Sequence, residues 1–171
     1  MNALDTNVLS ETSQRLANFV ALWFDGSGGE RFFTSNNLAV ARGAFLEFGG
    51  FEPSFRIAAA EDREFCDRWS AESRPSVGVA DAVVRHSHAL SVTGFLRQHY
   101  VYGRGARHFR RLRGRAGRRV RIAPAFYSAS LRHAALGSPP GRGLALAVCT
   151  MVAHAAYLTG LARETLIEMS S

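Results

Sequence analysis

Two neighbouring carboxylates, Glu61 and Asp62, are the residues of this chain best suited to acid–base chemistry. They open a predicted helix, whose positive N-terminal end favours an ionised carboxylate. Such a carboxylate, held within hydrogen-bond reach of a hydroxyl group, can remove its proton. Acidic residues at this position also serve commonly as helix caps. The pair therefore has two interpretations, a general base in a cleft or a structural cap.

Two imidazoles, His86 and His88, follow a predicted strand. Alternation in an extended segment places both rings on the same side. They can then bind one metal ion, or one can bind a metal ion and the other a phosphate group. The alternative interpretation is a pair of polar residues at the end of a strand.

The polar run Thr34-Ser35-Asn36-Asn37 interrupts an otherwise apolar extended segment. The amides of Asn36 and Asn37 offer donors and acceptors together, which suits a ligand rich in hydroxyl groups. The same residues are equally typical of a turn.

These side chains must be positioned by the elements between them. Apolar spacing predicts helices at 9–24, 42–48, 61–74, 91–113 and 124–136, with a further apolar helix at 144–162. Extended structure is expected at 31–40, and the β-branched residues at 77–84 predict a strand. The glycines within 102–105 weaken a helix interior, so a bend or a close contact is expected there.

Composition limits the class of protein. The chain has 171 residues, a net charge of +7 and no lysine, so every basic residue is arginine. Its size suits one domain with a real core, and its charge favours anionic partners. Cys66 and Cys149 lie far apart and predict neither a disulfide framework nor a thiolate metal site. The polar start lacks the blocks of a signal peptide, so a cytoplasmic protein is expected.

Nine of the eighteen residues at 104–121 are arginine. Nucleic-acid binding is one interpretation, but no helix-turn-helix, zinc or RNA-binding signature accompanies the run. A solvated basic face toward anionic lipid headgroups is the preferred interpretation. Nucleic acid is the partner that we rank last.

The segment 144–162 carries no formal charge and just reaches the length of about 18 apolar residues expected of a membrane span. Thr150, His154 and Thr159 lie within it. A helix that packs on the domain or lies at a membrane surface is favoured over a span.

Taken in order, five motifs resemble the acceptor-side half of a family 2 glycosyltransferase, the large inverting group built on the GT-A fold. The motifs are Thr34-Ser35-Asn36-Asn37, Gly49-Gly50-Phe51, Glu61-Asp62, His86-Ser87-His88 and Tyr102-Gly103-Arg104-Gly105. The resemblance covers most of the chain and is strongest from residue 31 to 105.

The resemblance implies a role for each motif residue. Asp62 would be the catalytic base, Glu61, Asn36, Asn37 and Arg104 would be substrate contacts, and His86, with His88 as the second choice, would be a metal ligand. The substrates would be a nucleotide-diphosphate sugar and a hydroxyl acceptor. The chain lacks the Gln-x-x-Arg-Trp of processive members, which favours transfer of a single sugar.

A divalent metal, Mg²⁺ or Mn²⁺, would bridge the two phosphates of such a donor. In the family the other metal ligand comes from an Asp-x-Asp motif, and this sequence contains none. The nucleotide-binding half is therefore expected to be missing. The metal is expected only with that half, and the chain would be an incomplete enzyme with little activity alone.

The sequence as a whole predicts an α/β fold, a partial GT-A-like mixed sheet flanked by helices, with a helical C-terminal extension. The expected division is a partial glycosyltransferase domain at 1–113, a basic connection with a short helix at 114–141 and an apolar helix at 142–171. The second functional hypothesis is a non-catalytic module that binds a membrane or a partner protein. In either case the protein would be cytoplasmic, with peripheral attachment at the inner face of the membrane as an option.

Overall fold

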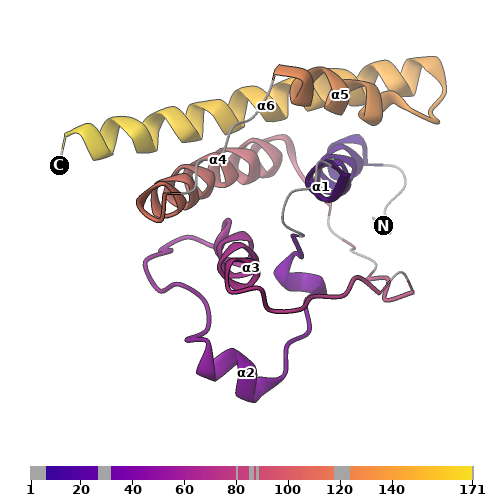
Figure 1. The fold of residues 1–171 in the computed structure, drawn as a ribbon. Helices are drawn as coiled ribbons and strands as arrows, with labels where there is room; N and C mark the ends of the chain where they lie inside the picture. The colour runs from indigo at the N-terminus through magenta and orange to yellow at the C-terminus, as the bar shows by residue number, and fades with distance from the viewer. Residues whose placement is uncertain are drawn as a thin grey trace.

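The computed structural model describes residues 7–26, 32–79, 81–84, 87, 89–117 and 124–170. At 25 and 26 it describes the backbone only. The elements in chain order are α1 (Val8–Gly26), the 3₁₀ turn η1 (Ser35–Asn37), α2 (Arg42–Glu47), α3 (Glu61–Ala71), α4 (Val92–Arg115), α5 (Pro124–Ala135) and α6 (Pro140–Met169). In Figure 1, α5 and α6 form one side of the molecule, α4 lies beneath α6, and α3 and α2 lie beyond α4.

Helices α4 and α6 run parallel and approach each other through glycine. A Cβ atom placed on Gly103 would lie 1.9 Å from the backbone oxygen of Tyr157, and one on Gly160 would lie 2.0 Å from that of Tyr100. The two backbones therefore touch directly at this crossing, and any larger residue would force them apart. The close contact expected from the glycines at 102–105 is confirmed.

Helices α1 and α5 complete the layer around α6. Phe19 of α1 packs against Phe126 and His133 of α5, with ring centroids 5.3 Å apart in both pairs. Arg15 donates hydrogen bonds to the carbonyl oxygens of Ala134 and Leu136, which satisfies acceptors left free at the end of α5. These contacts fix α1 against the C-terminal end of α5.

A second, smaller core lies under α3. Phe48, Phe65 and Cys66 are buried there, and Phe33 and Trp69 are among the partly buried residues packed against them. Arg68 of α3 donates hydrogen bonds to the carbonyl oxygens of Phe48 and Gly50. The turn after α2 depends on positive φ angles of 84° at Gly49 and 67° at Gly50, which glycine adopts without steric cost.

All helices that the sequence predicted are present, although α3 ends at Ala71 rather than at residue 74. The expected α/β fold is wrong, because the described residues form helices and turns and contain no β-strand. The strand predicted at 77–84 is wrong over 77–79 and 81–84. Val77 and Val79 are 77% and 65% exposed, and no described residue pairs with them as a neighbouring strand, which a stable strand needs. The proposed three-part division of the chain stays a prediction.

Candidate functional site

The Asp62 carboxylate is engaged by backbone groups. Its two oxygens accept hydrogen bonds from the backbone N–H groups of Ser35, at 2.9 Å, and Arg63, at 2.8 Å. Asp62 thus ties the start of α3 to the polar run at 34–37. This arrangement uses the carboxylate as a structural acceptor, and its role as a general base stays a prediction.

Glu61 and the loop before it lie close to α4. Ala60 has a positive φ of 70°, a backbone conformation that costs a non-glycine residue about 1–3 kcal/mol. The neighbouring Ala59 is buried, and a Cβ on Gly105 would lie 2.2 Å from its carbonyl oxygen. One carboxylate oxygen of Glu61 is buried without a hydrogen-bond partner among the described residues.

The other predicted site residues are dispersed or lie beyond what the structure describes. Asn37 donates to the carbonyl oxygen of Ala82 at 2.9 Å, and Asn36 accepts from the Thr34 hydroxyl. Arg104 points to α6, where its Nε lies 2.7 Å from a carboxylate oxygen of Glu164. His86 and His88 lie outside the described residues, and the part of the chain that is described holds no group of three or more metal-binding side chains.

One positive charge beside Asp62 was not singled out by the sequence patterns. The Arg63 guanidinium lies 4.1 Å from the ring centroid of Phe24 and 5.0 Å from that of Phe109. Burial among these rings lowers the pKa of Arg63 to about 10, while the cation–π contacts favour the charged form. Its aromatic neighbours come from α1 and α4, so sequence spacing gave no sign of them.

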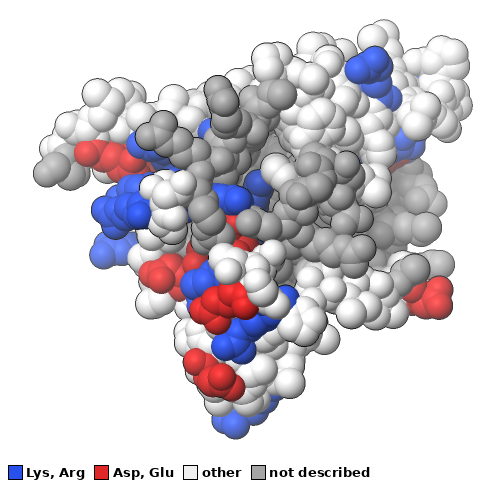
Figure 2. All heavy atoms as spheres, viewed as in Figure 1, with Lys and Arg blue, Asp and Glu red and all other residues white. Residues whose placement is uncertain are grey.

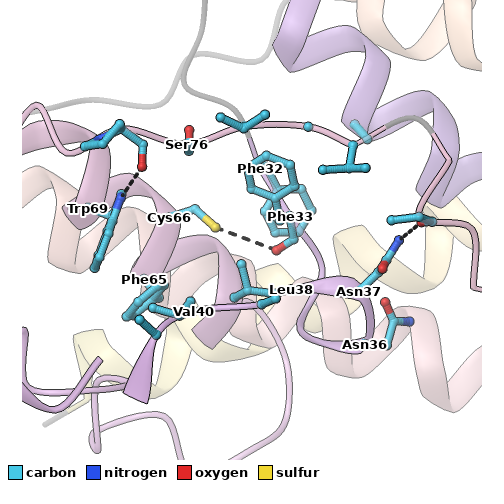
Figure 3. Close-up of a pocket in the computed structure, with 18 of the residues that line it drawn as sticks. Phe32, Phe33, Asn36, Asn37, Leu38, Val40, Phe65, Cys66, Trp69 and Ser76 are labelled. Carbon is cyan, nitrogen blue, oxygen red and sulfur yellow. Dashed lines mark hydrogen bonds between the residues drawn. The ribbon is translucent and has the colours of Figure 1, made fainter. Parts of the chain in front are cut away.

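The described residues line an open cavity of about 1160 Å³ beside α3 (Figure 3). Phe33, Leu38, Val40, Phe65 and Trp69 form its apolar wall, and Asn36 and Asn37 lie at one end. Among the described residues no charged side chain lines it, and Glu61 and Asp62 do not reach it. Of the residues assigned to substrate binding, only the two asparagines border this space.

Four of the five arginines at 104–113 form ion pairs within the fold. Arg107 lies 2.7 Å from Glu168 of α6, and Arg113 lies 2.6 Å from Asp67, which is a buried carboxylate of α3. Together with the Arg104–Glu164 pair, these bridges hold α4 to both of its neighbours. In Figure 2 the two signs of charge are interleaved over this part of the molecule. The described arginines at 104–113 are thus part of a packing interface more than a solvated basic face.

Helix α6 exposes apolar side chains on the side that faces away from α4. We call this set the outer face of α6: Leu144, Val148, Met151, Val152, Ala155, Leu158, Ala162 and Leu166. Leu144 is 68% exposed and Leu158 is 47% exposed. The inner face buries Leu146, Thr150 and Ala153. The helix is therefore apolar on both faces, and the rest of the chain buries only the inner face.

Comparisons with protein-family models, with curated proteins and with solved structures give no match. The described residues form no sheet and no family model matches, so the assignment to family 2 of the glycosyltransferases is wrong. The description of the chain as a GT-A-type glycosyltransferase is therefore wrong as well.

Proposed function

We propose that this chain is a non-catalytic module that attaches to an anionic membrane surface through the outer face of α6. One observation carries the proposal: α6 is 30 residues long and is apolar enough to contact hydrocarbon, yet most of that apolar stretch is not buried by the rest of the chain. Transfer of apolar side chains from water into the boundary of a bilayer is favourable by about 1.5–3 kcal/mol for each large residue that becomes fully buried.

The packing favours a helix that lies on the bilayer over a helix that spans it. Helix α4 runs beside α6 and brings Arg104 and Arg107 to Glu164 and Glu168. A span over 144–162 would draw α4, which packs against Tyr157 and Gly160, toward hydrocarbon together with Arg97 and Arg104, and each such charge costs several kcal/mol there. A flat orientation leaves the ion pairs on the side away from the lipid and buries only the outer face.

Charge supports an anionic surface. The sequence from 140 to 163 contains no acidic residue, and the whole chain carries +7. Arg163 on α6 and Arg132 on α5 are both exposed. Each arginine near an anionic membrane contributes about 1 kcal/mol, and salt screens this contribution.

Flotation of the purified protein with vesicles tests the proposal. We expect the protein to float with vesicles that contain phosphatidylglycerol, less with neutral phosphatidylcholine vesicles, and less again in high salt. The double substitution Met151→Glu with Leu158→Glu places two charges on the outer face. It should lower the partition coefficient by at least about tenfold, which is the effect of about 1.4 kcal/mol.

A charge-matched control is Leu46→Glu with Val83→Glu. Both residues are exposed apolar side chains outside α6, so this variant should float as the unmodified chain does. Circular dichroism checks that both double variants fold. Equal flotation of the two variants would remove α6 as the attachment surface. Concentration-dependent dimers without vesicle binding would instead show that the outer face pairs with a second copy.

A further inference from the structure

The cavity beside α3 is bounded by two stretches of chain without helical structure. Leu38, which leads out of η1, has φ and ψ of −119° and 127°, in the β region. Residues 38–40 form one border, and residues 75–79 form the other (Figure 3). Neither stretch belongs to a strand among the described residues.

Hydrogen bonds hold the two borders in place at both ends. Asn37 Nδ2 donates to the carbonyl oxygen of Ala82, at 2.9 Å, and Trp69 Nε1 donates to that of Pro75, at 3.1 Å. Between them, the Cys66 thiol lies 3.7 Å from the carbonyl oxygen of Phe33 on the cavity wall. The borders are therefore fixed apart by side chains, with an open space between them.

The backbone groups along these borders are unused within the described structure. The N–H and C=O groups of 38–40 and of 76–78 make no hydrogen bond to any described residue. Unpaired groups of extended backbone are the surface to which another strand can add. The space between them is lined by apolar and aromatic side chains, which suits the alternate side chains of such a strand.

We infer that this cavity binds an extended, uncharged segment of a partner polypeptide by adding it as a strand along one border. Backbone hydrogen bonds to 38–40 or 76–78 would supply affinity, and every second side chain of the segment would enter the apolar space. An acyl chain would match the lining but would leave the backbone groups unpaired, which costs free energy once water is excluded. A charged peptide would find no charged side chain among the described lining residues. The inference does not depend on α6.

The test uses a fluorescein-labelled hexapeptide of alternating valine and threonine, followed by fluorescence anisotropy with the full chain. Its matched control has the same side chains but carries N-methyl groups on alternate backbone nitrogens, which removes donors on one edge. We expect the first peptide to bind at least about tenfold more tightly than the second, because the lost hydrogen bonds amount to more than 1.4 kcal/mol.

Two protein variants locate the binding. Ala39 is exposed and lines the cavity, so Ala39→Glu should weaken peptide binding at least about tenfold without unfolding the chain. Leu46→Glu adds the same charge away from the cavity and should leave binding unchanged. The Met151→Glu and Leu158→Glu variant should also bind the peptide normally, which separates this inference from the membrane proposal.

Three results would overturn the inference. The first is no binding of the unmodified peptide up to about 1 mM, which corresponds to about −4 kcal/mol. The second is equal binding of the N-methylated peptide, which would leave no role for backbone pairing. The third is displacement of the peptide by palmitate with equal sensitivity to Ala39→Glu, which would assign the cavity to an apolar small molecule.

Discussion

The layer formed by α1, α4, α5 and α6 is closely packed. The region that contains α2, α3 and the segments at 38–40 and 75–79 is packed more loosely. In the first region, backbones meet at Gly103 and Gly160, and ion pairs such as Arg107–Glu168 hold the contact. In the second region a small aromatic core borders an open cavity, and Val77 and Val79 are exposed. The chain therefore closes its helical layer by itself, whereas the segments beside the cavity have no hydrogen-bonded neighbour among the described residues.

The largest expected effect comes from the small core of the second region. Phe65 is 2% exposed and lies 5.5 Å from the ring centroids of both Phe45 and Phe48. Phe65→Ala should destabilise this region by about 3–5 kcal/mol, through lost burial and the resulting cavity. Hydrogen exchange should show faster exchange at 32–79 and retained protection in α6. Equal loss of protection in both regions would mean that they unfold as one unit.

In the helical layer, the corresponding destabilising substitution is at the contact between Gly103 and Tyr157. Gly103→Ala should cost about 3 kcal/mol, because its Cβ would collide with the Tyr157 backbone. Gly114→Ala lies on the same helix with nothing within 4 Å of the added Cβ, so it should instead stabilise by up to about 1 kcal/mol. Chemical denaturation of both variants gives the two free energies of unfolding. The same sign for both would contradict the close approach.

Low pH should weaken the helical layer through His99. This residue is 3% exposed on α4. Burial, with a smaller effect of His154, lowers its pKa to about 4. Because the unfolded chain binds the proton near pH 6.5, stability is lost as pH falls from about 6.5 to 4, by roughly 2–3 kcal/mol.

Denaturation at several pH values measures this slope. His99→Leu should remove most of it, and His108 and His154, whose pKa values are also lowered by burial, should account for a remainder. An unchanged slope in His99→Leu would assign the acid sensitivity to other groups.

The smallest effect is expected for the Arg104–Glu164 ion pair between α4 and α6. Arg104 and Glu164 side chains are each about one-quarter exposed, so solvent screens their interaction. Arg104→Gln should cost less than about 1 kcal/mol. A double-mutant cycle with Glu164→Gln measures the pair itself. A coupling energy well above that value would make charge, and not glycine packing, the main tie between the two helices.

Periodicity in the sequence was sufficient for the helices because each apolar stripe lies within one short window. The spacing of Phe65, Cys66 and Trp69 predicted α3, and these residues face the small core. The strand at 77–84 could not be decided in this way. Its valines favour a strand, but a strand also needs a paired neighbour. Whether such a neighbour exists depends on residues distant in the sequence.

The candidate site was predicted less well, for a physical reason of the same kind. Glu61 and Asp62 do open a helix, yet the partner of Asp62 is a backbone N–H at Ser35. The arginines of α4 find their acidic partners in α3 and in the last turns of α6. Such partners are distant in the sequence, so the run looked solvated. The apolar stretch at 144–162 was visible because it needs no partner to be recognised.

The direct contact of backbones at Gly103 and Gly160 has a mechanical meaning. Helices seated so closely cannot rotate about each other without a clash, so α4 and α6 behave as a single stiff beam. Figure 1 shows α3 on the opposite side of that beam from the outward surface of α6. A membrane or partner that binds the outer face of α6 therefore also fixes the orientation of α3. The cavity beside Trp69 would then face the surrounding solution.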